Sequence, residues 1–167
     1  NPGPGPKRQA FVESMEMQPI DPQTNGPQLL YGLHYVTRIV KPDEPGTYHH
    51  QTGYWLWDAA TETVFQTLAI PRVQVALASG PAKAEATRFQ VTAKRGESGA
   101  GICSGPFLEY AFRTDAYRID VTVEGPDRWS YDEETVLVIK GQAAPFRHVD
   151  TNTLTRVGSP VPNPLMR

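Results

Sequence analysis

Four histidines are the side chains of this sequence best suited to bind a metal or to exchange a proton near neutral pH. His34 lies within an alternating apolar segment, where a structural role is the simplest interpretation. His49 and His50 are adjacent, so they cannot both face the same side of a regular strand. His148 stands near the start of the last extended segment. As a neutral imidazole, each of them is a good ligand for iron.

His148 is the strongest candidate metal ligand of the four. By alternation its side chain shares a strand face with Leu154, but also with Asp150 and Asn152. Alternation therefore leaves open whether the imidazole faces an interior or the solvent. Haem iron needs only one ligand from the protein, so a single histidine in a cavity wall would be enough for that cofactor.

Two tryptophans mark the segment Thr52-Gly53-Tyr54-Trp55-Leu56-Trp57-Asp58. Trp55 and Trp57 are two residues apart and would stand on the same face of a strand. The residues between and before them are also apolar, so the strand is expected to be covered on both sides. The pair either packs in a hydrophobic core or lines a cavity for a flat apolar ligand. For the second alternative, Trp55, Trp57 and His50 are the predicted wall residues.

Other arrangements of reactive residues are weak. Asp132, Glu133 and Glu134 are adjacent, so they alternate between faces, and a solvated strand edge is their expected environment. Residues 96–105 are glycine-rich but do not form the dinucleotide-binding fingerprint, and a turn or a bulged strand is expected there. Cys103 has no activating base beside it and is expected to be a small buried residue. No Ser-His-Asp, CxxC or HExxH motif is present, so no catalytic residue is predicted.

Length and composition restrict the class of protein. A chain of 167 residues is long enough for one domain with a hydrophobic core. The formal net charge of −2 provides no positive field for nucleic acid, and no run of about 18 apolar residues predicts a membrane span. Residues 1–9 lack the apolar stretch of a signal peptide. The single cysteine fits a reducing compartment, so a cytoplasmic protein is expected.

Apolar and polar residues alternate in many short segments that Pro and Gly separate, which predicts about nine or ten antiparallel strands. Residues 106–113 fit either a short helical turn or an irregular strand. The expected strands cover residues 10–20, 28–40, 49–58, 63–70, 73–79, 87–95, 117–123, 129–139 and 147–157.

Sequential hairpins close most simply as an all-β, antiparallel up-and-down barrel, which removes exposed sheet edges; an open sandwich is the alternative. A barrel of about eight to ten strands is wide enough to hold one small ligand. The barrel domain is predicted over residues 9–157. A disordered or extended arm is expected over residues 1–8, and a Pro-rich tail over residues 158–167.

Several motifs, in this order and spacing, resemble the bacterial haem-binding β-barrel family related to nitrobindins. The similarity extends from about Gln9 to Val157. The segments that carry it are Gln28-Leu29-Leu30-Tyr31-Gly32-Leu33-His34-Tyr35, residues 50–58, Ile70-Pro71-Arg72, residues 101–108, Phe112-Arg113-Thr114 and residues 146–156.

The resemblance implies a ten-stranded antiparallel barrel of the fatty-acid-binding-protein type, without the helical lid of that family. It implies haem b as cofactor and a proximal histidine ligand near the C-terminus, at a position that His148 matches. Nitrobindin-like haem binds nitric oxide and is linked to the isomerisation of peroxynitrite to nitrate. Such barrels begin with a Gly-x-Trp-x-Gly strand, and none precedes Gln9. A barrel without this first strand is expected to have an open edge.

Three functional hypotheses follow. The first is a soluble ligand-binding barrel that holds haem through His148. The second is a carrier for a fatty acid or another apolar molecule, with a residue such as Arg118 meeting a carboxylate. The third is a haem-dependent peroxynitrite isomerase. The expected partner in all three is a small molecule, and the sequence leaves both a monomer and a homodimer open.

Overall fold

The computed structural model describes residues 8–161 and residue 163. The predicted arm over residues 1–8 therefore lies outside the described residues, except for Arg8. Positions 162 and 164–167 of the predicted tail also lie outside them. The described part of that tail contains no helix or strand.

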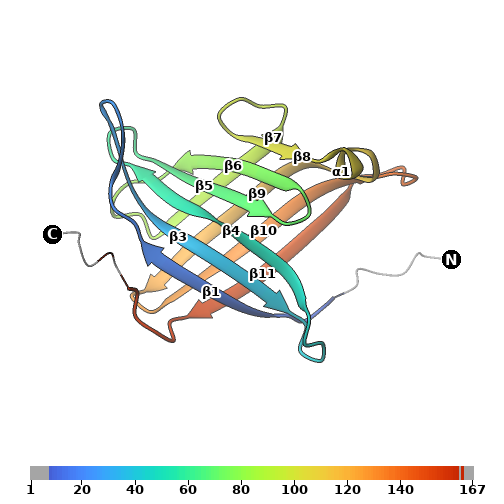
Figure 1. Ribbon diagram of the computed structural model, residues 1–167, viewed down its shortest axis with the longest axis horizontal. Helices are drawn as coiled ribbons and strands as arrows, with labels where there is room; N and C mark the ends of the chain where they lie inside the picture. The colour runs from blue at the N-terminus through green and yellow to red at the C-terminus, as the bar shows by residue number, and fades with distance from the viewer. Residues whose placement is uncertain (1–7, 162, 164–167) are drawn as a thin grey trace.

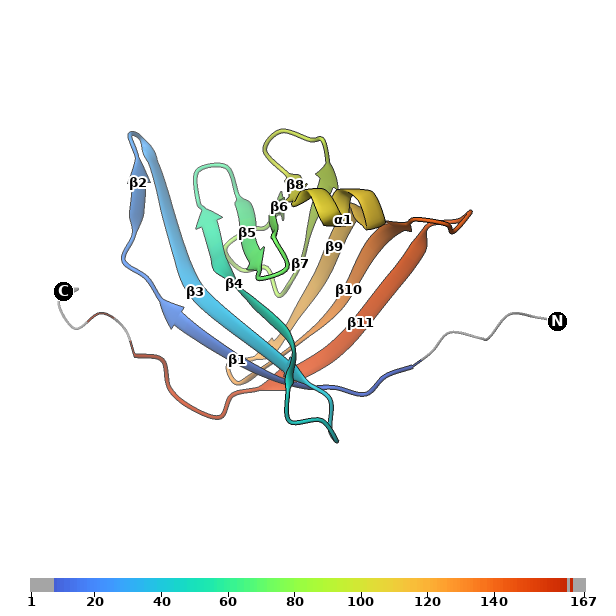
Figure 2. The ribbon, with the colours of Figure 1, turned by 45° about the vertical axis from the view of Figure 1, so that its right-hand side comes forward.

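Eleven strands and one short helix make up the described chain; Figure 1 labels all of them except β2, which Figure 2 labels. Their bounds are β1 (Val12–Pro19), β2 (Gln23–Asn25), β3 (Gln28–Val40), β4 (Thr47–Asp58), β5 (Thr63–Ile70), β6 (Gln74–Pro81), β7 (Arg88–Arg95), β8 (Gly101–Ser104), α1 (Pro106–Ala111), β9 (Phe112–Gly125), β10 (Arg128–Ile139) and β11 (Phe146–Thr155).

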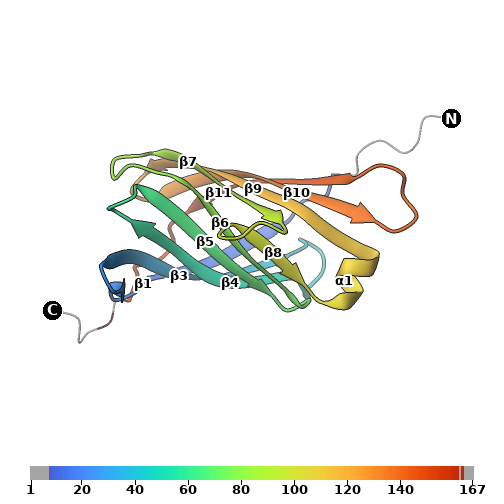
Figure 3. The ribbon, with the colours of Figure 1, turned by 90° about the horizontal axis from the view of Figure 1, so that it is seen from above.

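Ten of the strands follow one another around a barrel in the order β1-β3-β4-β5-β6-β8-β7-β9-β10-β11, and the short β2 pairs with β3 off this path. All the pairings are antiparallel except that between β7 and β8, which is parallel. Figure 3 shows one wall built from β3, β4 and β5 opposite another built from β7, β9 and β10. The predicted all-β barrel of about ten strands is confirmed.

One seam of the barrel is unsealed. No strand pairing joins β1 to β11 within the described residues, which agrees with the open edge expected from the sequence. Side chains connect the two sides instead, because Asn152 of β11 donates a 2.9 Å hydrogen bond to Glu13 of β1. Figure 2 shows β1 and β11 approaching each other beneath the barrel.

Alternation determines which side chains enter the barrel. In β9, Tyr117, Ile119 and Val121 are buried, at 8%, 4% and 5% exposure. Arg118 points outward between them and forms ion pairs with Asp120 and Asp132. The same two-residue period that predicts these strands therefore produces the inner and outer surfaces of the barrel.

A hydrophobic core closes one end of the barrel. Trp55 and Phe89 meet there edge to face, with ring centroids 5.8 Å apart. Trp57, Trp129 and Leu154 pack against the same cluster. These residues stand near the end of β4, the beginnings of β7 and β10 and the end of β11, so the register brings the three tryptophans and Phe89 together at one end. Their concentration leaves the other end open for a cavity.

One local prediction is wrong, and two sets of alternatives are decided. The glycine-rich segment contains a turn followed by a short paired strand, β8, in which residues 101–104 bridge β6 and β7. Cys103 is exposed, since its neighbour Ile102 takes the inward position of that strand. Residues 106–111 form the helix α1, which begins at Pro106, a favoured first helical residue. No helix in the described part of the chain is long and apolar enough to cross a membrane.

Candidate ligand-binding site

A cavity of about 470 Å³ occupies the open end of the barrel. This is the end where α1 lies beside the loop between β10 and β11 (Figure 1). The volume is within the range of about 300–1,000 Å³ that is usual for sites of small molecules. One wall is apolar and includes Leu68, Ile70, Ala76, Ile102, Leu108 and Ile119.

His148 lines this cavity, so the imidazole that the sequence singled out faces the interior. Its Nδ1 lies 3.1 Å from Asp150 Oδ2. The hydrogen bond to Asp150 raises the pKa of His148, and burial partly opposes that effect. Because Asp150 engages Nδ1, the other ring nitrogen, Nε2, is the one available to a ligand.

The two adjacent histidines of β4 lie on different faces. His49 lines the cavity, and its Nε2 lies 3.2 Å from Gln51 Oε1. Burial lowers the pKa of His49. His50 is exposed, pairs in register with Arg38, and is not among the residues that line the cavity. Alternation from Trp55 already assigns His49 to the inner face, so the sequence contains the signal that distinguishes the pair.

The two tryptophans of β4 face the same way but have different surroundings. Trp55 is 9% exposed and lines the cavity. Trp57 is not a lining residue, because it lies nearer the closed end, where its Nε1 donates a 2.9 Å hydrogen bond to the carbonyl of Ala82. Trp55 therefore belongs both to the core and to the cavity wall, whereas Trp57 belongs to the core.

A chain of hydrogen-bonded side chains crosses the interior beside the cavity. Gln51 Nε2 donates to the Tyr35 hydroxyl at 2.8 Å, and Gln66 Nε2 reaches the same oxygen at 3.4 Å. The Tyr117 hydroxyl lies 2.9 Å from Gln66 Oε1 and 3.1 Å from Glu133 Oε2. We call these five residues the polar bridge. Since β5 and β9 are not neighbours in the sheet, the contact between Gln66 and Tyr117 joins opposite walls.

Glu133 ends the polar bridge and lines the cavity. Burial raises the pKa of its carboxyl to about 7; the charge of Asp150 adds to this effect, whereas the hydrogen bond with Tyr117 opposes it. The predicted solvated edge is therefore wrong for Glu133, because alternation along β10 turns its side chain inward between the outward-facing Asp132 and Glu134. Glu133 is the main site residue that the sequence analysis missed.

The proton count of the bridge depends on Glu133. The Tyr117 hydroxyl has one proton and faces two acceptors. If Glu133 is protonated, it donates to Tyr117, which then donates to Gln66, and both contacts are satisfied. If Glu133 is ionised, Tyr117 donates to only one of the two acceptors. The bridge is therefore fully paired when Glu133 carries a proton.

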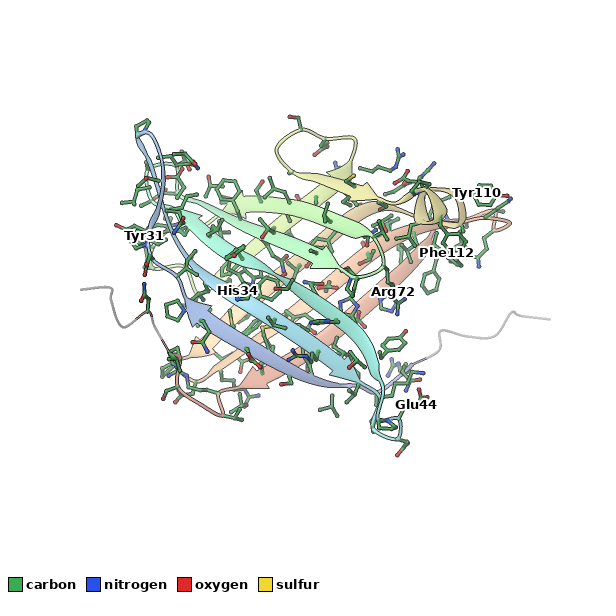
Figure 4. The ribbon with its side chains drawn as sticks, viewed as in Figure 1. Tyr31, His34, Glu44, Arg72, Tyr110 and Phe112 are labelled. Carbon is green, nitrogen blue, oxygen red and sulfur yellow. The ribbon has the colours of Figure 1, made fainter. Side chains whose placement is uncertain are left out.

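Cations are scarce in the cavity. Arg72, in the turn between β5 and β6, is the one Lys or Arg among its lining residues in the described chain. Arg72 Nη2 donates a 3.1 Å hydrogen bond to the carbonyl of Tyr48. Figure 4 shows Arg72 in the half of the barrel that carries Phe112 and Tyr110, away from Tyr31 at the opposite end. Arg118, the suggested carboxylate partner, faces outward and is not in the cavity.

His34 lies outside the cavity, in a shallow outer groove that Tyr54 also lines. Its Nε2 lies 3.0 Å from Thr52 Oγ1, and its ring centroid is 5.2 Å from that of Tyr54. These contacts agree with the structural role expected for this histidine.

A nearly closed β-barrel with one large cavity and an imidazole in its wall defines a class of proteins that bind small ligands. Comparison with family models gives the particular family. The THAP4-like, heme-binding beta-barrel domain matches residues 2–156. The chain therefore belongs to this haem-binding β-barrel family, the nitrobindin family, over nearly its whole length. Neither a curated protein nor a solved structure matches the chain significantly.

Proposed function

We propose that the cavity binds haem b and that His148 would be the ligand that the protein provides to the iron. The observation that carries this proposal is the His148 imidazole in the cavity wall, with Nδ1 held by Asp150. Hydrogen bonding of one ring nitrogen to a carboxylate fixes the tautomer and orients the other nitrogen toward a metal. Asp150 would therefore position His148 as the ligand.

The residues of the cavity fit the chemistry of haem. The porphyrin supplies four ligands to the iron, so a single imidazole is enough. The apolar wall of the cavity suits a flat apolar ring, and Arg72 could pair with one of the carboxylates that haem carries. No group of three or more His, Cys, Asp or Glu side chains in the described residues could hold a bare metal ion.

We also propose that the haem-loaded protein binds nitric oxide or isomerises peroxynitrite. Bound haem would supply the iron chemistry for binding nitric oxide or for converting peroxynitrite. The residues of this chain would exclude water through the apolar wall of Leu68, Ile70 and Ile102. The decay rate of peroxynitrite with haem-loaded protein, compared with free hemin, tests the isomerase hypothesis. An unchanged decay rate would leave haem binding without this activity.

Hemin titration tests the proposed ligand. The parent protein should bind about one equivalent of hemin with a histidine-ligated Soret spectrum. His148→Ala should lose that spectrum, whereas His34→Ala should retain it, because His34 lies outside the cavity. An unchanged spectrum in His148→Ala would remove His148 as the ligand, and no binding by the parent would refute the haem proposal.

The affinity for hemin should fall as the pH decreases. Only a neutral imidazole binds iron, and the pKa of His148 is raised, mainly by its hydrogen bond to Asp150. Protons should therefore compete with iron at a higher pH than for an ordinary histidine. Asp150→Asn should move the acid loss of binding to lower pH, because it removes the carboxylate that stabilises the imidazolium. Coincident pH profiles of the parent and Asp150→Asn would contradict this role of Asp150.

An apolar ligand without iron is the second candidate function. The apolar wall of the cavity favours this function. Arg118, however, is not placed to bind the carboxylate of a fatty acid in the cavity, because it pairs with Asp132 outside the barrel. Mass spectrometry of organic extracts from the purified protein tests this candidate. If the protein shows no Soret band and releases one equivalent of lipid, the carrier function would be supported in place of haem binding.

A further inference from the structure

Thr37 is a buried residue whose hydroxyl lacks a partner. Its side chain is 5% exposed and lines the cavity. Thr37 Oγ1 is the one buried side-chain nitrogen or oxygen atom without a hydrogen-bond partner in the described part of the chain. In the sheet, Thr37 lies between Met15 of β1 and Gln51 of β4. Burying a hydroxyl without a hydrogen-bond partner costs free energy, unless a molecule in the cavity forms a hydrogen bond with it.

Three carboxylates face the same side of the cavity. Glu133 of β10 and Asp150 of β11 are direct neighbours across the two strands. Glu13 of β1 lies across the seam, where the Tyr131 hydroxyl donates a 2.7 Å hydrogen bond to it. Glu13 pairs with Ile39, two residues from Thr37, so Glu13 and Thr37 are diagonal neighbours at about 7–8 Å.

Three side chains of the cavity wall can carry a positive charge. His148 of β11 is engaged with Asp150, His49 of β4 is partly buried beside Gln51, and Arg72 lies in the turn after β5. No other Lys, Arg or His lines the cavity among the described residues. The side between Thr37 and Glu133 carries three carboxylates, of which Asp150 pairs with His148, whereas the wall formed by Leu68, Ile70 and Ile102 is apolar.

We propose that the side of the cavity formed by Thr37, Glu13, Glu133 and Asp150 is a subsite for a hydroxyl or primary ammonium head group on an apolar ligand. Such a head group donates a hydrogen bond to Thr37 Oγ1 or to a carboxylate, and the apolar part lies along the wall of Leu68, Ile70 and Ile102. A carboxylate head is disfavoured, because ionised Glu13 and Glu133 have the same charge and neither forms an ion pair among the described residues. The inference does not rest on haem binding.

Three eight-carbon ligands that differ only in their head group test this subsite. 1-Octanol, octylammonium and octanoate are titrated into the haem-free full chain at about pH 8, where the amine is protonated and octanoate is ionised. The fluorescence of Trp55 and Trp129, which line the cavity, reports binding. Octanol and octylammonium should bind at least about tenfold more tightly than octanoate, because of the like charges beside the head group.

Variants locate the head group. Thr37→Val keeps the shape of the side chain but removes the hydroxyl, so the affinity for octanol should fall about fivefold. Thr122→Val, on the strand face opposite to buried Val121, is the control and should leave the affinity unchanged. Glu133→Gln should reduce the discrimination against octanoate, whereas Glu134→Gln, which is paired outside with Arg147, should not.

Three outcomes would overturn the subsite. They are octanoate binding as tightly as octanol, octanol binding that is indifferent to Thr37→Val, and no binding of any of the three ligands. Preference for octylammonium over octanol would identify the carboxylates as the main partners, and the reverse would identify Thr37. Since these titrations involve no iron, their failure leaves the hemin titration of His148→Ala unaffected, and the two proposals are tested separately.

Discussion

Replacing Gly53 by alanine should destabilise the protein by about 3 kcal/mol, because overpacking of a filled interior forces the backbone to move. A Cβ at Gly53 would overlap the carbonyl oxygen of Thr67 in the neighbouring strand β5. The Tyr35 hydroxyl donates a 3.1 Å hydrogen bond to that same oxygen. The substitution should therefore separate β4 from β5 and also disturb the polar bridge.

Gly46→Ala is the matched control for this experiment. A Cβ at Gly46 meets no atom within 4 Å, so its effect on the free energy of unfolding should be within about 0.5 kcal/mol. Urea unfolding followed by tryptophan fluorescence measures both variants. A Gly53→Ala variant as stable as Gly46→Ala would show that β4 and β5 do not approach each other as closely as described.

The stability of the protein should decrease as the pH rises from about 4.5 to about 7, and Glu133 should be responsible for much of this decrease. Burial raises the pKa of Glu133 from 4.5 to about 7 in the folded protein. Between these values the folded chain holds a proton that the unfolded chain has released, so a rising pH favours unfolding. The change is up to about 3 kcal/mol, since each pKa unit corresponds to about 1.4 kcal/mol and cavity water screens part of it.

Glu133→Gln should flatten this part of the stability profile, because glutamine does not titrate. Glu134→Gln removes a carboxylate from the next position of β10, where it pairs with Arg147 on the outer face, and should retain the slope of the parent. Denaturant unfolding at several pH values gives the three profiles. A Glu133→Gln profile that is parallel to the parent's would mean that Glu133 is already ionised in the folded protein.

Local alternation predicts much of the barrel but little of its interior chemistry. It places Trp55 and His49 on one face of β4 and Tyr117 on the inner face of β9, as the structure confirms. It cannot show that Gln66 and Tyr117 meet, because these residues are 51 positions apart and come from strands that do not pair. The polar bridge is a product of barrel closure, which no single segment encodes.

For the candidate site as well, alternation predicts part of the arrangement and barrel closure decides the rest. For His148, alternation within β11 leaves its orientation open, and the closure of the cavity around that strand decides it. For Glu133, the period of β10 was sufficient to separate it from Asp132 and Glu134. The predicted solvated edge follows the rule that charged residues are usually exposed, and Glu133 is an exception to that rule.

The unsealed seam also has a consequence for the order of folding. Glu13 and Asn152 meet across 139 residues of chain, whereas hairpins such as β9–β10 join neighbouring segments. Closing a long loop costs more entropy than closing a short one, so contacts across the seam should form after the hairpins. Backbone pairing does not join β1 to β11 even in the folded barrel. Until the side chains of Glu13 and Asn152 meet, these two edges lie apart, and in this interval the curved sheet is most exposed to pairing with another unfinished chain.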